Sequence, residues 1–303
     1  MGYFRNIYGD QNVYISGEKL RGVQSVNASF EIPYEPIKAA GIGYLNYTIN
    51  SSLEGSFDVN RYVVSNEDPL SGLLGSEISG HIHYGTGEKP LLLSFNKGYV
   101  NSYSSSCSVG NVPNIDFGVV AYGDIGSGVP TGIEKSNSEI IAIARPGDIT
   151  LEGVSGHTTN RVQSYSYNIS IPRKPIYTLG SGLEPGLFNI DYPIEIDLSF
   201  DMHVDDFEVE NMHDLLCDQP KDDISIILSG CNIDYFLRKF IAPKPLFLGI
   251  DQNSSVDDQL SVTLKYKSYI NDVRSLPPLI GGGVVKINII TEGDGSVTFV
   301  EFF

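Results

Sequence analysis

Two stretches of the chain alternate between apolar and polar residues, and they match each other. Residues 22–43 (GVQSVNASFEIPYEPIKAAGIG) align without gaps with residues 161–182 (RVQSYSYNISIPRKPIYTLGSG), so that Val23 matches Val162, with nine identities. Alternation with a period of two is typical of a half-buried β-strand. Both copies end in I-P-x-x-P-I, and proline removes a backbone donor and fixes φ. The pattern therefore predicts the same strand twice, ending at the same place.

A second match follows in both halves. LEGSFDV (53–59) corresponds to IDLSFDM (196–202), and in both segments apolar residues alternate with acidic or hydroxyl residues. We expect the acidic side of each strand to face solvent, because a period-two pattern separates the two faces of a sheet. The candidate residues on this acidic side are Glu54, Asp58, Glu195, Asp197 and Asp201.

The remainder of each half predicts one short helix and further strands. One helix is expected within 66–74, with Asp68 as its cap and Pro69 at its first helical position, and the other at 205–216. Two strands are expected within 99–122, joined through GNVPN, with another at 262–266 and a final hairpin that turns at 293–295.

The predicted fold is therefore mainly β, with two tandem copies of a β-sandwich or small-barrel domain, each with one short flanking α-helix. We place the first copy at residues 1–150 and the second at 151–303, because Pro146, Gly147 and Gly156 interrupt the periodicity between them. This division gives the chain two similar domains without a long linker.

Charge narrows the classes of function. The 303 residues include 20 Lys and Arg against 37 Asp and Glu, so the formal net charge is −17. The two halves carry −6 and −11 of it. A chain this acidic repels phosphate backbones, which disfavours ordinary nucleic-acid binding but is compatible with letting nucleic acid pass. The sequence shows neither the apolar core of a signal peptide nor 18 consecutive apolar residues, so we expect no membrane insertion.

Candidate chemistry is sparse. His81 and His83 share a strand face, but a metal site needs further ligands, so we expect them to be structural. The acidic run between Asp201 and Asp223 lacks the spacing of a calcium loop. The cysteines, at positions 107, 217 and 231, show no disulfide or metal-binding spacing. No phosphate-binding loop or nucleophile elbow is found, and we predict no catalytic residue, no metal and no cofactor.

The layout resembles the tail-tube proteins of bacteriophages, in particular the duplicated tubes of long-tailed phages. The resemblance lies in the I-P-x-x-P-I break, the long amphipathic strand, the short helix, the V-G-N-V-P segment at 109–113 after Tyr103, and the F-x-x-x-A strand at 117–121. It implies a structural virion protein that is not an enzyme, located in the virion tail and assembled in the host cytoplasm. Its partners would be further copies of itself and other tail proteins.

The same resemblance implies rings stacked into a hollow tube, with three chains forming a pseudo-sixfold ring. DNA would pass through the acidic lumen during ejection without specific binding. The lumen would be lined by the strands around 44–60 and 188–204, which carry Glu54, Asp58, Glu195, Asp197 and Asp201.

Two other interpretations stay open at this point. One is a tail hub, distal tail or neck ring protein of the same fold. The other is a glycan-binding β-sandwich protein, whose site would place exposed aromatic residues in a groove. The 18 tyrosines permit such a site. An enzyme is the third and least supported class, because no catalytic motif is present.

Overall fold

The computed structural model is built almost entirely from β-strands. It describes residues 11–31, 34–39, 42–49, 53–63, 74–84, 91–126, 149–153, 162–180, 185–203, 222–229, 236–253, 261–272, 280–281, 288–291 and 297–300. These residues contain no helix. The predicted helix at 205–216 lies outside them, as does the one at 66–74 apart from Leu74, which is in a turn. The prediction of a mainly β fold is confirmed.

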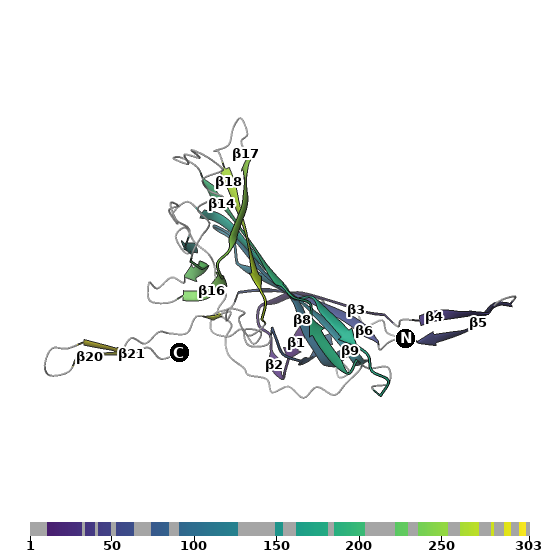
Figure 1. Cartoon of the computed structure of the whole chain (residues 1–303). Helices are drawn as coiled ribbons and strands as arrows, with labels where there is room; N and C mark the ends of the chain where they lie inside the picture. The colour runs from purple at the N-terminus through teal and green to yellow at the C-terminus, as the bar shows by residue number, and fades with distance from the viewer. Residues whose placement is uncertain are drawn as a thin grey trace.

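One large sheet holds most of the structure (Figure 1). Its eleven strands are β1 (Gln11–Ile15), β2 (Glu18–Lys19), β3 (Val23–Glu31), β6 (Glu54–Tyr62), β7 (Ile78–Tyr84), β8 (Leu91–Ser108), β9 (Asn114–Gly126), β11 (Val162–Ser170), β14 (Ile194–His203), β17 (Leu246–Asn253) and β18 (Ser261–Ile270). The predicted strands within 99–122 and 262–266 are confirmed as β8, β9 and β18.

The other strands form smaller sheets. Four of them pair as β10 (Ile149–Glu152), β15 (Ile224–Ser229), β16 (Phe236–Ala242) and β19 (Ile280–Gly281). Three hairpins complete the described chain: β4 (Tyr34–Ala39) with β5 (Ile42–Ile49), β12 (Arg173–Ile176) with β13 (Leu187–Ile190), and β20 (Asn288–Thr291) with β21 (Val297–Val300). The last is the hairpin predicted at the end of the sequence.

The large sheet branches at β8, its longest strand. One edge of β8 pairs with β9, while its other edge pairs with β7 in the first part and with β11 in the second part. β11 comes from the second half of the chain, so β8 joins the two halves into one sheet. Figure 1 shows this sheet running without a break from β3, β6 and β9 to β14, β18 and β17.

Strand pairings follow the same order in both halves. The ladder β3–β6–β9–β8–β7–β1 of the first half has its counterpart in β11–β14–β18–β17 and β16–β15–β10 of the second. The β-bulges recur as well: one opens the β3–β6 and β11–β14 ladders, and another interrupts β8–β9 and β17–β18. After the first strand of each half comes a glycine with positive φ, Gly17 at 83° and Gly153 at 87°.

The register of these ladders refines the sequence alignment. Glu31 lies opposite Glu54, and Ser170 lies opposite Glu195. Since Ser170 is the counterpart of Glu31 in the alignment, the structure makes Glu195 the counterpart of Glu54, whereas the SFD match would assign Asp197 to it. A shift by two positions keeps every side chain on its own face of the strand.

The two halves differ where β8 has its counterpart. β8 runs through without interruption, whereas in the second half Pro243 and Pro245 separate β16 from β17. Proline removes ladder donors, so β16 leaves the large sheet and pairs in the smaller one. The two sheets then form two layers: the Tyr167 hydroxyl donates to the Ile241 carbonyl at 2.9 Å, and its ring lies 5.3 Å from that of Phe240.

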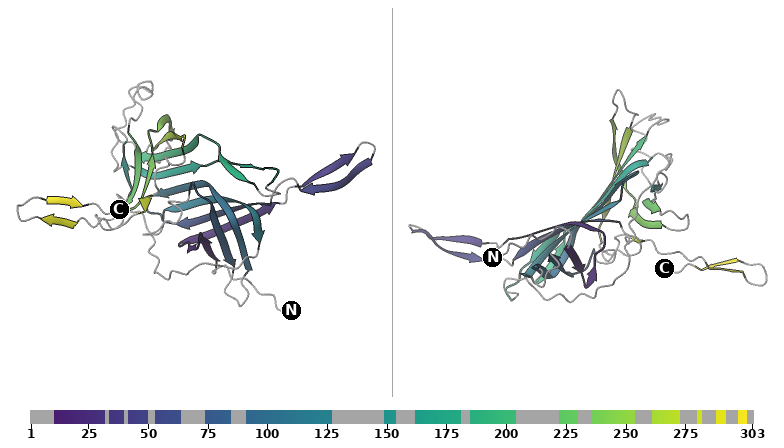
Figure 2. Two further views of the ribbon diagram at one scale, coloured as in Figure 1. Left: turned by 60° about the horizontal axis from the view of Figure 1, so that its bottom comes forward. Right: turned by 180° about the vertical axis from the view of Figure 1, so that it is seen from behind.

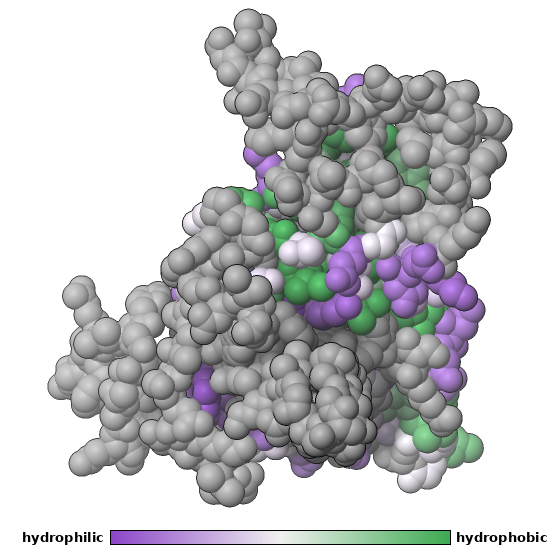
Figure 3. All heavy atoms as spheres, turned by 90° about the vertical axis from the view of Figure 1, so that its left-hand side faces the viewer, coloured by the Kyte–Doolittle hydropathy of each residue, from purple (hydrophilic) through white to green (hydrophobic). Residues whose placement is uncertain are grey.

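One apolar core runs through both halves. On β14 every second described residue is buried, as the alternation predicts, and the same holds for β6 and, beyond the bulge after Val162, for β11. Phe57 and Phe95 meet across the first half at 4.6 Å between ring centroids. Where described residues are visible from the side in Figure 3, apolar residues gather near the middle and hydrophilic residues border them.

The three hairpins differ in whether they pack against the rest of the chain. β12–β13 contacts the first half of the chain, because Phe188 packs on Tyr99 and Tyr122. By contrast, β4–β5 and β20–β21 extend away from the sheets in every view (Figures 1 and 2).

Candidate functional site

The face of the large sheet opposite the core is the candidate functional surface. We call it the polar face and define it as the outward side chains of β6, β9, β8, β11, β14 and β18. All five acidic residues singled out from the sequence lie on it: Glu54 and Asp58 are exposed, and Glu195, Asp197 and Asp201 are half-buried. They alternate with core residues such as Phe57 and Phe200, which fixes their direction.

Cross-strand pairing orders these residues into rows. One row runs Asn27, Asp58, Gly118, Ser102, Ser170, Glu195. The next runs Asn60, Asp116, Ser104, Asn168, Asp197, Lys267. The acids of the two halves therefore lie on the same side of one continuous sheet, with the strands β8 and β11 between them.

The centre of the polar face carries no charge. Along the seam where β8 meets β11, the outward residues are Ser102, Ser104, Ser106, Ser108, Ser164, Ser166, Asn168 and Ser170. Short hydroxyl and amide side chains stay hydrated without projecting far from the sheet. The seam is thus a small-residue polar strip flanked by acidic strands on both sides.

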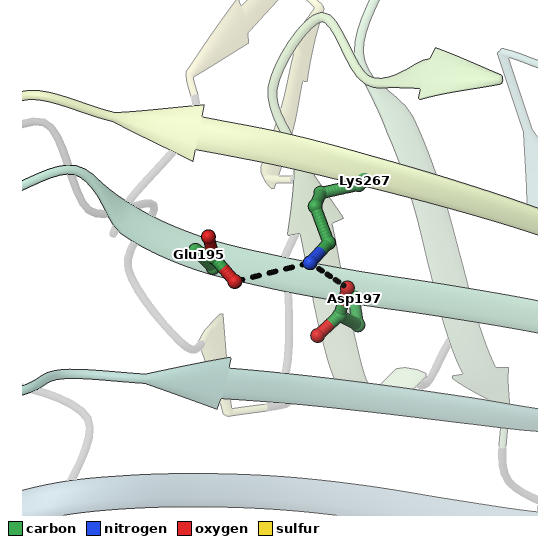
Figure 4. A network of polar contacts seen from close by, with 3 residues as sticks. All are labelled: Glu195, Asp197 and Lys267. Atoms are coloured by element: carbon green, nitrogen blue, oxygen red, sulfur yellow. Dashed lines mark hydrogen bonds and ion pairs between the residues drawn. The ribbon is translucent and has the colours of Figure 1, made fainter. Parts of the chain in front are cut away.

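Lysine partly neutralises the acids of the second half. Lys267 of β18 reaches between Glu195 at 3.0 Å and Asp197 at 3.1 Å (Figure 4). The hydrogen bond from the ammonium to Glu195, followed by that to Asp197, raises the pKa of Lys267 to about 12. This lysine therefore stays charged and occupied by two carboxylates, which reduces its availability to a passing phosphate.

Two further carboxylates, Asp201 and Asp251, also have polar partners. Asp201 accepts hydrogen bonds from the hydroxyls of Thr263, at 2.6 Å, and Ser164. Asp251 of β17 forms an ion pair with Lys265. The two lysines of β18 on this face are therefore both paired with carboxylates.

An open depression of about 360 Å³ lies in the first half of the polar face. Gly118 is one of its lining residues and lies between Asp58 and Ser102 in the row, and a Cβ there would come within 2.6 Å of the side chains of Asn101 and Ser102. The depression also contains Asp116, which accepts a hydrogen bond from Asn60 at 2.5 Å. Among the described residues that line it, the one aromatic residue is Phe117, which is 2% exposed.

The candidate metal ligands are packed into the protein. His81 stacks on Tyr14 with 4.5 Å between ring centroids, and burial, followed by the nearby His83, lowers the pKa of His81. No group of three or more potential ligands is found among the described residues. Burial raises the pKa of Cys107 to about 11, which keeps this thiol protonated; Cys217, Cys231 and most of the acidic run lie outside the described residues.

Comparison with known proteins leaves the family open. No protein-family model matches the chain, and the curated proteins include none that matches it in sequence. Within the described part of the chain, there is no helix long and apolar enough to cross a membrane.

Several residues of the polar face were not predicted from the sequence. Sequence reasoning selected acids on β6 and β14 but overlooked Asp116, Lys267 and the serine strip. Asp116 and the serines are visible in the sequence as the polar positions of the alternating segments 102–108 and 114–122. Lys267 pairs with acids of a strand far back in the chain, and no local pattern indicates that contact.

Proposed function

We propose that this chain is a structural virion protein, the subunit of a phage tail tube in which rings stack around an acidic lumen. The chain is not an enzyme in this proposal and needs no cofactor. Three chains form each ring, since each chain contributes two copies of one domain, and the polar face lines the hole. Copies of the same chain and other tail proteins are its partners, in a virion tail assembled in the host cytoplasm.

The observation that carries the proposal is the character of the polar face. Acidic strands flank a strip of serine and asparagine, and the lysines of β18 are engaged by carboxylates. DNA binds proteins chiefly through phosphate contacts with free Lys and Arg, which release counterions. A wall with few such cations and an excess of acids offers DNA a wet, repulsive surface along which it slides without adhering.

The proposed duplication is supported by the strand order. The same pairings, the same bulges and a glycine with positive φ recur in both halves. The division between the copies fits best just before β10, since this strand crosses residue 150 and pairs with β15. Two similar units joined edge to edge in one chain favour cyclic assembly from fewer chains than domains.

The depression in the polar face argues against a glycan site there. The depression offers carboxylates and amides for sugar hydroxyls, but Phe117, the aromatic residue among its described lining residues, is buried. Sugar sites commonly stack rings against exposed aromatics. A hub, distal tail or neck ring would share the fold and the ring, and differs from a tube in forming single rings instead of long stacks.

Negative-stain microscopy of the purified chain at high concentration tests the proposal. We expect rings or hollow cylinders, with cylinders favouring the tube and isolated rings the hub or neck ring. A strictly monomeric protein under these conditions, or one that binds oligosaccharides tightly, would contradict it.

A further inference from the structure

In the described part of the chain, the large sheet has three terminal strands: the two-residue β2 and the two longer strands β3 and β17. Among the described residues, β3 pairs only with β6, and β17 pairs only with β18. Unpaired strand edges expose backbone donors and acceptors that readily pair with another chain. Exposed apolar side chains gather at these edges: Phe30 on β3 is 58% exposed, and at the β17 edge Leu246, Leu248 and Tyr269 are 46%, 55% and 46% exposed.

Within the chain, one strand of each half already pairs edge to edge, and we call this β8–β11 contact the joint. The end of β8 pairs with β11 so that Tyr103 lies opposite Ile169 and Ser105 lies opposite Tyr167. All four of these side chains are at most 1% exposed. β8 belongs to the first half and β11 to the second half, so this is the contact between the two proposed domain copies.

Each open edge is the counterpart of one side of that joint. β3 corresponds to β11, with Val23 matching Val162 both in the sequence alignment and in the shared bulge. β17 corresponds to β8, with Phe247 matching Val100, because a bulge follows each of these two residues. The free edge of β17 therefore takes the place of the β8 edge that β11 covers.

The hairpin β12–β13 lies beside the contact of β8 with β11, and its counterpart in the first half is the hairpin β4–β5. Arg173 of β12 donates from Nη2 to the Leu74 carbonyl at 2.6 Å and lies 4.8 Å from the ring centre of Tyr99. Phe188 of β13 packs on Tyr99 and Tyr122. In the alignment that matches Val100 with Phe247, Tyr99 corresponds to Leu246 of β17 and Tyr122 corresponds to Tyr269 of β18. Leu246 and Tyr269 are both exposed. The corresponding hairpin, β4–β5, extends away from its own chain (Figures 1 and 2).

We propose that the β17 edge of one chain pairs antiparallel with the β3 edge of a second copy, and that the β4–β5 hairpin of that copy lies over Leu246 and Tyr269. This contact would be the interface between neighbouring chains in the proposed ring, so it rests on the proposed function as a ring-forming protein. Transferring the register of β8 and β11 places Ile250 opposite Phe30 and Asp251 opposite Ser29. Ile250 and Phe30 then take the places of the buried pair Tyr103 and Ile169, which accounts for the exposure of Phe30 in the single chain.

This register is testable by disulfide formation between chains. Asp251→Cys and Ser29→Cys chains are mixed and oxidised, then run on a non-reducing gel. Residues directly opposite in an antiparallel pair have Cα atoms about 4.5–5.5 Å apart, within the range of a disulfide, whereas a two-residue slip gives about 7–8 Å. The matched control mixes Asp251→Cys with Asn27→Cys. Each single variant alone controls for Cys107, Cys217 and Cys231.

We expect the Asp251→Cys and Ser29→Cys mixture to give about fivefold more disulfide dimer than the slipped control. Rings in microscopy without this selective cross-link would overturn the edge pairing and leave the ring proposal standing. A selective cross-link without rings or cylinders would support the edge pairing and count against the tube. Equal cross-linking in both mixtures would overturn the register.

Discussion

Phe30→Ala separates assembly from folding. Phe30 is 58% exposed in the single chain, and the proposed joint buries it against Ile250 of a second copy. A phenylalanine side chain buries about 150–250 Å² in full, so the joint removes roughly 100 Å² from water. At about 25 cal/mol per Å², and allowing for the methyl group that alanine keeps, the variant weakens each joint by about 2 kcal/mol, or about 30-fold.

The assay is the concentration dependence of assembly, followed by light scattering or sedimentation. Phe30→Leu is the matched control, since it keeps an apolar side chain of similar size and should assemble within about threefold of the parent chain. The unfolding free energy of Phe30→Ala in urea should change by less than about 1 kcal/mol, because the side chain is largely exposed before assembly. Unchanged assembly of Phe30→Ala would refute the reasoning.

Four further changes test the core, the hairpin, the polar face and the histidine pair. Tyr167→Phe removes the hydroxyl that donates to Ile241 and should lower the unfolding free energy in urea by about 1 kcal/mol. Arg173→Ala removes the donors to Leu74 and Val100 and should cost about 1–3 kcal/mol in the same assay. Asp58→Lys places a free cation in the depression of the polar face, so assembled particles should retain DNA more strongly at low salt, and by a margin that shrinks as salt rises. Because the pKa of His81 is lowered in the fold, the unfolded chain binds the proton first; stability should fall as pH drops below about 6.5, and His81→Asn should melt with less pH dependence.

Each of these four predictions has a control variant or an outcome that would contradict it. Tyr177→Phe alters an exposed tyrosine and should leave stability unchanged; an equal loss in both tyrosine variants would contradict the buried hydrogen bond. Full stability of Arg173→Ala would show that β12–β13 is not held by this side chain. Asp58→Asn removes the same charge without adding a cation, and equal DNA retention by both Asp58 variants would refute adhesion by the lysine. An unchanged pH dependence in His81→Asn would assign it to other groups.

The strands were predictable because alternation is local. Residues 165–170 and 194–202 alternate cleanly, and the structure buries the apolar positions of both. The acids of 54–58 and 195–201 were placed on the opposite face for the same reason. What the alternation could not give is the neighbour of each strand, since pairing depends on contacts far apart in the chain.

Three features show this limit. Phe30 belongs to the apolar face by pattern, but β3 is an edge strand and leaves it exposed. The SFD match pairs Asp58 with Asp201, whereas the ladders make Ser199 the counterpart of Asp58. The joint of β8 with β11 makes one sheet of two expected domains, and no local signal in either strand indicates it.

The central claim is that chains join edge to edge into a ring with the polar face towards the hole. A cryo-microscopy map of the assembled particle, at a resolution that separates strands, tests it most directly. We predict that the serine strip of β8 and β11 and the carboxylate of Asp58 line the channel, and that β17 of each chain lies beside β3 of the next. A map with the polar face on the outer surface, or with β3 and β17 apart, would contradict it.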